Sequence, residues 1–132
     1  MIAREEFETM LGRLNGGAVQ VREVESGGGV WIVAGIDDLA AEVIATYAPP
    51  VAVLRVNVMA LPPGGRERGL LRRLLELNAT DLVHGSYGLE GAQVVLTAAL
   101  ELEHLDQSEL QASFDSLTLA LASHLAALAS YR

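Results

Sequence analysis

The sequence predicts an α+β fold that combines an antiparallel, twisted sheet with helices, in the order α-β-β-(β)-β-α-β-β-α. Apolar residues recur every three to four positions at both ends and in the middle of the 132-residue chain, which indicates amphipathic helices. Between these segments the apolar residues alternate with polar ones, and clusters of Gly and Pro separate the runs, as is typical of strands joined by turns. We expect a single domain over residues 1–132.

The first element is expected to be a short helix over residues 3–14. Its apolar positions share one face, and they are Phe7, Met10, Leu11 and Leu14. Arg4 and Glu8 lie four residues apart and are expected to pair on the exposed side. The sequence Asn-Gly-Gly at 15–17 tolerates positive φ angles and therefore predicts the end of the helix.

Three or four strands are expected next, around 19–22, 30–33, 42–47 and 51–61. The glycine-rich segment 26–29 predicts a hairpin turn, and Asp37-Asp38 a solvated turn. The alternative to a strand at 42–47 is a helical turn that would start at 39–41. In the strand at 51–61, one face is wholly apolar while the other becomes polar halfway along, so we expect a sheet with one covered and one partly open face.

The second half predicts a helix over 66–78, a hairpin from strands near 83–89 and 93–98, and a long helix from Asp106 to about residue 131. Glu109 follows Asp106 at the spacing of a capping box. Between residues 110 and 129 the only Asp, Glu, Lys or Arg is Asp115. Because a surface helix of a monomer normally has a charged outer side, this helix is expected to contact more than one neighbour. Its main stripe is Phe114, Leu117, Leu121, Leu125 and Leu128, and the first four are candidates for the core or for a dimer contact.

Composition narrows the functional classes. The net charge is −8, and the nine cationic side chains are all Arg, so the clustered positive surface of a nucleic-acid-binding protein is not expected. The chain has no cysteine, which excludes disulfides and thiolate metal sites. No apolar run reaches the ~20 residues of a membrane span, so we expect no membrane insertion and a cytoplasmic location.

Several short motifs link the chain to a known group of proteins. They are Leu-Leu-Glu-Leu-Asn at 74–78, Tyr-Gly-Leu at 87–89, Val-Val-Leu at 94–96, and Leu-Glu-Leu-Glu-His-Leu-Asp at 100–106 before the closing helix. This order resembles the YbjN-like proteins and the small dimeric chaperones of type III secretion, which share one fold. The resemblance implies a homodimer whose sheet and helices present apolar surfaces to an extended segment of another protein. The additional strand at 42–47 departs from the secretion chaperones.

Candidate partner-binding residues lie on two elements. On the sheet they are Trp31, Val51, Val53 and Arg55, with Trp31 assigned either to the core or to the open face. On the helix at 66–78 they belong to an arginine cluster, Arg66, Arg68, Arg72 and Arg73, which is either a solvated face or a docking patch for an acidic segment. The alternative function is a regulatory domain that senses a small molecule in an apolar pocket between the sheet and the C-terminal helix.

No residue pattern predicts catalysis or a cofactor. The histidines stand at 84, 104 and 124, and none has a second His at the i+3 or i+4 spacing of a helical metal site. His104 with Glu101 and Glu103 would make only a weak cluster, which is expected to be solvated. The neighbouring His84 and Ser86 lack the spacing of a nucleophile elbow. We therefore expect a non-enzymatic protein without a metal or cofactor, which acts by binding another protein.

Overall fold

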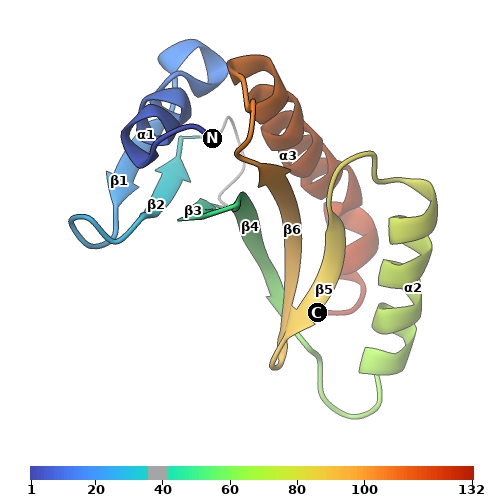
Figure 1. The fold of residues 1–132 in the computed structure, drawn as a ribbon. Coiled ribbons are helices and arrows are strands. Elements are labelled where there is room, and N and C mark those ends of the chain that lie inside the picture. Colours follow the sequence, from blue (N-terminus) through green and yellow to red (C-terminus); the bar gives the residue numbers. More distant parts are fainter. Residues whose placement is uncertain (36–41) are drawn as a thin grey trace.

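A computed structural model describes residues 1–35 and 42–132, so the expected Asp37-Asp38 turn and the alternative helical start at 39–41 lie outside the described residues. The described part contains one antiparallel sheet of six strands in the order β1-β2-β3-β4-β6-β5 (Figure 1). The strands are β1 (Gln20–Glu23), β2 (Val30–Ala34), β3 (Val43–Ala48), β4 (Val51–Ala60), β5 (Ser86–Glu90) and β6 (Gln93–Glu101). The expected strand at 42–47 is therefore present as β3.

Within the described residues, three α-helices accompany the sheet: α1 (Arg4–Gly12), α2 (Glu67–Thr80) and α3 (Gln107–Ala129). The short 3-10 segment η1 (Leu14–Gly17) follows α1, and its Asn15 has a φ of 54°. Asn15 joins α3 through its backbone N–H, which donates to Gln111 at 2.9 Å, and through its side-chain oxygen, which accepts from the same amide at 2.8 Å. Helix α2 lies beside the edge strand β5 (Figure 1).

The core lies between the helices and one face of the sheet. Alternate residues of the central strands are buried on this covered face, as in Ala52, Leu54 and Val56 of β4. Their neighbours Val51, Val53 and Arg55 point to the other face and are only half-buried. The expectation of one covered and one partly open face is met by this pattern.

The end of β4 differs from the expected alternation. A register shift relative to β6 occurs between Asn57 and Met59. A bulge of this kind inserts one extra residue on one strand and re-aims the side chains that follow it. Met59 consequently enters the core, while Val58 is half-buried and Ala60 is exposed.

Helix α1 is fixed by contacts that cross to the sheet. Arg4 pairs with Glu23 of β1 at 3.3 Å, and its guanidinium lies 5.4 Å from the centre of the Trp31 ring. Glu8 accepts a hydrogen bond from the Trp31 indole N–H at 2.6 Å. The expected Arg4–Glu8 pair is therefore absent, and each residue has its own partner on the sheet. Spacing within the helix does not reveal these partners.

Helix α3 begins as predicted. The Asp106 carboxylate accepts a hydrogen bond from the Glu109 backbone N–H at 2.8 Å, so Asp106 is the N-cap. The buried residues of the helix are Leu110, Ser113, Phe114, Leu117, Leu121, His124 and Leu128. By length and composition α3 is also apolar enough to cross a membrane, but one third of its most apolar window is buried inside this fold.

Candidate protein-binding surfaces

The uncovered side of the sheet, called the open face below, carries rows of β-branched side chains. Strand register places Ile32 of β2 opposite Ile44 of β3, and Ile44 opposite Arg55 of β4. A neighbouring row is formed by Val30, Thr46, Val53 and Ala99. Each of these side chains except exposed Ala99 is half-buried, so the rows form a continuous surface that water still reaches.

Arg55 supplies the charge at the edge of this surface. Its guanidinium donates to the Glu90 carboxylate at 2.6 Å, and Glu90 belongs to β5, which is separated from β4 by β6. The Arg55 Nε is buried and has no hydrogen-bond partner among residues 1–35 and 42–132. Buried donors are normally satisfied, so this nitrogen is unusual within the described part of the surface.

Trp31 does not belong to the open face. Its side chain is 0% exposed and points to the covered face, where its ring packs edge-on against Phe7 at 5.6 Å between centroids. Of the two assignments that the sequence left open for Trp31, this burial fits the core. The reason is its place in the β2 alternation, where Trp31 and Val33 face inward while Val30 and Ile32 face outward.

A second apolar surface lies where α2 meets β5, and it is called the α2–β5 surface below. It surrounds a cavity of about 250 Å³ whose walls are Leu71, Leu74, Leu75, Asn78, Tyr87, Gly88 and Leu89. Leu75 is 69% exposed and Leu89 is 48% exposed. Strand β5 is also an edge of the sheet, so its outer backbone groups have no neighbouring strand in the described chain. Exposed leucines beside a free edge are a common mark of an interface.

The four arginines near α2 do not act as one group. Arg66 donates to the backbone oxygens of Ser130 and Arg132, and so ties the start of α2 to the end of α3. Arg68 and Arg72 are exposed, while Arg73 is half-buried. Among the described residues, none of the four forms an ion pair with a carboxylate.

The candidates from the last helix are core residues. Phe114, Leu117 and Leu121 are at most 4% exposed and pack against the sheet within the chain. Leu125 is 37% exposed, because the buried stripe passes through His124 instead. Phe114, Leu117 and Leu121 therefore fit the core alternative in this structure. The sequence spacing predicts this buried stripe, because the helical period places four residues on one face: Leu117, Leu121, His124 and Leu128.

His124 connects three elements around the α2–β5 surface. Its Nδ1 lies 2.7 Å from the Tyr87 hydroxyl of β5, and its Nε2 lies 3.5 Å from the Asp81 carboxylate at the end of α2. Burial raises the pKa of Tyr87 to about 12, so this phenol keeps its proton at neutral pH. Asn78 adds a second link between α2 and β5. Its side chain accepts a hydrogen bond from the Tyr87 backbone N–H at 2.7 Å and donates one to the Tyr87 backbone oxygen at 3.1 Å.

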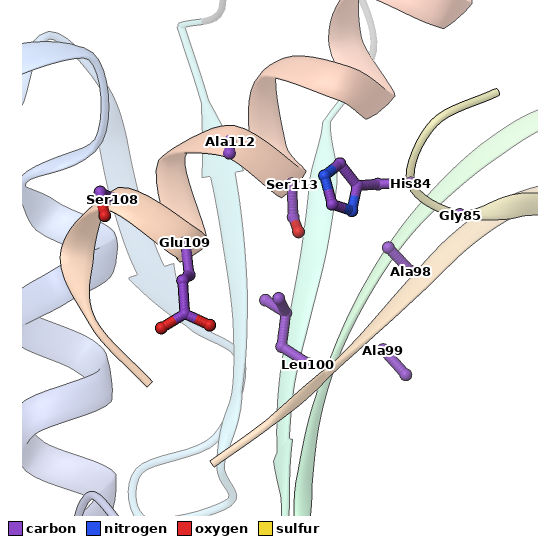
Figure 2. Close-up of a pocket in the computed structure, with 9 residues that line it drawn as sticks. All are labelled: His84, Gly85, Ala98, Ala99, Leu100, Ser108, Glu109, Ala112 and Ser113. Carbon is purple, nitrogen blue, oxygen red and sulfur yellow. The ribbon is translucent and has the colours of Figure 1, made fainter. Parts of the chain in front are cut away.

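A larger cavity, of about 410 Å³, lies between β6 and the first turns of α3, and its walls are His84, Gly85, Ala98, Ala99, Leu100, Ser108, Glu109, Ala112 and Ser113 (Figure 2). It is in the region where an apolar ligand pocket was expected as an alternative. Its walls are mixed, since they carry an imidazole, a carboxylate and hydroxyl groups beside small apolar side chains. Deeper between sheet and helix, the space is filled by core residues such as Phe114 and Leu117.

The weak catalytic and metal candidates are not gathered into a site. His104 is 91% exposed on its side chain and faces only Glu103, at 3.6 Å. Within the described residues, no group of three or more His, Cys, Asp or Glu side chains could hold a metal ion. Ser86 starts β5, whereas His84 lines the larger cavity with residues of α3 and β6.

Comparison with known proteins assigns the family. A search of curated protein sequences gives no match. Two solved structures share the fold. One is the heterodimeric ExoU–SpcU complex from the type III secretion system of Pseudomonas aeruginosa, with a TM-score of 0.59, 17% identity, and coverage of 88% of this chain and 92% of that chain. The other is the ExsC–ExsE complex, with a TM-score of 0.58, 13% identity and 94% of both chains covered.

The expected type III secretion chaperone-like α+β fold is confirmed by these structures. The model of the CesT_Tir_1 family matches residues 4–132, nearly the whole chain. Family and structural neighbours together support a chaperone that binds another protein. The chain belongs to the CesT_Tir_1 family, a family of type III secretion chaperones.

Proposed function

We propose that this protein is a homodimeric, non-enzymatic chaperone of the bacterial cytoplasm, in which residues 1–132 act as one domain and bind an extended segment of a partner protein. Membership of the chaperone family supports the general role. The observation that carries the proposal is the open face, where half-buried β-branched rows lie beside an arginine with an unsatisfied nitrogen. A regulatory role of the kind suggested for YbjN-like proteins would use the same binding activity.

The client segment is expected to cross the rows of the open face. Ile32, Ile44 and Val53 offer apolar contacts on three adjacent strands. Covering them would remove apolar area from water, which contributes roughly 25 cal/mol per Å² before the entropy costs of binding. Arg55 would then contact a carboxylate or a backbone oxygen of the client, while Val51 extends the apolar row at the end of β4.

The α2–β5 surface is the proposed dimer contact. It combines Leu75, Leu89 and a nearly all-apolar cavity with a free strand edge. In a dimer with a twofold axis, this surface of one copy would contact the same surface of the other copy, as in isologous dimers. Arg68 and Arg72 of the same helix stay at the rim of such a contact, where they favour an acidic segment of a partner.

Client binding is tested on the open face with one charge-introducing variant, Val53→Arg, and a control, Val83→Arg. Val83 lies between α2 and β5, outside the strands, and is 87% exposed, so its change leaves the open face intact. The host proteins that co-purify with the wild-type chain are identified by mass spectrometry, and their binding is then measured with purified components. Loss with Val53→Arg and retention with Val83→Arg is the expected result. Equal binding by both variants would place the client elsewhere.

The dimer is tested by light scattering on Leu75→Arg and Leu119→Arg. The two leucines are almost equally exposed, at 69% and 67%, but Leu119 lies on α3 outside the α2–β5 surface. The wild-type protein and Leu119→Arg are expected at twice the 14.0 kDa of one chain, and Leu75→Arg at the monomer mass. A wild-type monomer at tens of micromolar would refute the dimer without affecting the client-binding proposal.

A further inference from the structure

The cavity of about 410 Å³ beside α3 has no part in the chaperone role proposed above. It is open to solvent and lies between β6, the segment before β5, and the first two turns of α3 (Figure 2). Small side chains create its room, since Ala98 and Ala112 form part of the wall. Gly85 is required there, because its φ is +84° and an added Cβ would lie 2.5 Å from the Thr97 backbone oxygen.

Ser113 gives the first sign of a ligand. The residue is only 2% exposed, yet its hydroxyl makes no hydrogen bond to another described residue. In Figure 2 the hydroxyl is directed into the cavity, beside the ring of His84. The Thr118 hydroxyl of the same helix, by contrast, donates to the Phe114 backbone oxygen one turn earlier. The Ser113 hydroxyl therefore lies on the cavity wall, where it is free to donate to or accept from a polar group placed there.

The negative charge of Glu109 determines whether the cavity favours a cationic or an anionic ligand. It stands one helical turn before Ser113, so both side chains lie on the same face of α3. None of the wall residues is an Arg or Lys, and Glu109 forms no ion pair with a described residue. The start of a helix carries a partial charge of only about +0.5, whereas Glu109 and the nearby Asp106 bring two full negative charges. A cation is therefore favoured over an anion.

We propose that this cavity binds a cationic group on an aliphatic stem, an alkylammonium or alkylguanidinium. The cation donates to the Glu109 carboxylate and the Ser113 hydroxyl, and such charge-assisted bonds are stronger than neutral ones. The stem lies along Ala98, Leu100 and Ala112. The ring of His84 closes the cavity beside Ser113 and offers a ring nitrogen to the ligand. This chemistry has two sources, a Lys or Arg side chain of a protein segment and a free alkyl amine.

The direct test is a titration of ¹⁵N-labelled full-length protein followed by NMR. The probes are N-acetyl-lysine methylamide and N-acetyl-norleucine methylamide, which share the stem and differ in the charged end. The lysine probe is expected to shift the amide signals of Gly85, Ala99 and Ala112, and the norleucine probe to bind at least tenfold more weakly. Absence of shifts with the lysine probe at tens of millimolar, or equal binding of both probes, would overturn the proposal.

Variants separate the site from non-specific charge attraction. Glu109→Gln keeps a residue that is compatible with the helix start, because Gln also serves at the third helical position. It is expected to weaken lysine-probe binding about tenfold, and Ser113→Ala severalfold. The control Glu76→Gln removes an exposed carboxylate from α2 and should leave binding unchanged. Equal weakening by Glu76→Gln and Glu109→Gln would show general attraction to an acidic protein and refute the site. Circular dichroism confirms that each variant is folded.

The source of the cation is then distinguished with butylamine and a lysine-containing peptide cut from a co-purifying client. Tighter binding of the peptide, lost in Glu109→Gln, assigns the cavity to a side chain of a protein segment. Equal affinity for butylamine assigns it to a free amine. Both results support the proposed chemistry, and neither depends on whether the open face binds the client.

Discussion

The Tyr87 hydroxyl lies 2.7 Å from Nδ1 of His124, and this buried contact joins the edge strand β5 to the long helix α3. Burial raises the pKa of Tyr87 to about 12, so the phenol keeps its proton at neutral pH, and Nε2 of the same imidazole lies 3.5 Å from the Asp81 carboxylate. The rings are also in contact, with centroids 5.8 Å apart. The position of the α2–β5 surface therefore depends on a polar contact inside the core.

Removing this hydroxyl should destabilise the protein. In Tyr87→Phe the imidazole nitrogen is left buried without its hydrogen-bond partner, which costs about 1–3 kcal/mol of unfolding free energy. The control is Tyr131→Phe, because the Tyr131 hydroxyl makes no hydrogen bond to a described residue. Urea unfolding followed by circular dichroism measures both variants. Equal midpoints for the two variants would show that the Tyr87–His124 bond contributes nothing to stability.

Two glycines near β5 should respond very differently to alanine. Gly85 has a φ of +84°, and an added Cβ would lie 2.5 Å from the Thr97 oxygen and 2.8 Å from a methyl carbon of Leu117. Gly88 has no atom within 4 Å of the same position and no positive φ. Gly85→Ala is expected to lose about 1–3 kcal/mol or more, and Gly88→Ala to change little. Thermal unfolding of both variants measures the difference, and a similar melting temperature would contradict the strain at Gly85.

Local signals predicted most of the elements. Asp106 and Glu109 marked the start of α3 by their spacing, and the structure confirms Asp106 as the N-cap. Gly and Pro clusters separated the strands, so β3 and β4 were placed within one or two residues of their bounds. These features depend on residues close in sequence, where backbone preferences and capping bonds act directly.

Features that depend on distant partners were not predicted. The bulge in β4 follows from its register with β6, and the Glu8–Trp31 hydrogen bond spans 23 residues. The burial of Trp31 depends on which side of the sheet the helices cover, and alternation alone leaves the two faces equivalent. The cavity at Ser113 and His84 joins residues from separate elements, so no sequence motif marks it.

Two leucines of α3, Leu117 and Leu119, should contribute very differently to the stability of the fold. Leu117 is fully buried, whereas Leu119 is mostly exposed two residues later. Leu117→Ala leaves a cavity in the core and is expected to lower the free energy of unfolding by about 2–5 kcal/mol. Leu119→Ala should change it by less than about 0.5 kcal/mol. Chemical denaturation measures both, and a large loss from Leu119→Ala would show that its side chain is covered in solution.

The N-cap of α3 should make stability depend on acid pH. The Glu109 backbone N–H and the Ser108 hydroxyl hold the pKa of Asp106 below its ordinary value. Because the carboxylate is favoured in the folded state, its contribution is present above the pKa of the unfolded chain, about 3.9, and is lost as the pH falls through the lower folded value. Asp106→Asn keeps an effective cap without a titrating group.

The wild-type protein should therefore lose its advantage over Asp106→Asn as the pH is lowered from about 6 to about 3. Glu103 also has a lowered pKa, but it is present in both proteins and cancels in the difference. Denaturant unfolding at a series of pH values measures this difference directly. A constant difference across the series would mean that the charge of Asp106 does not stabilise the start of α3, and that the hydrogen bond acts equally well with a neutral side chain.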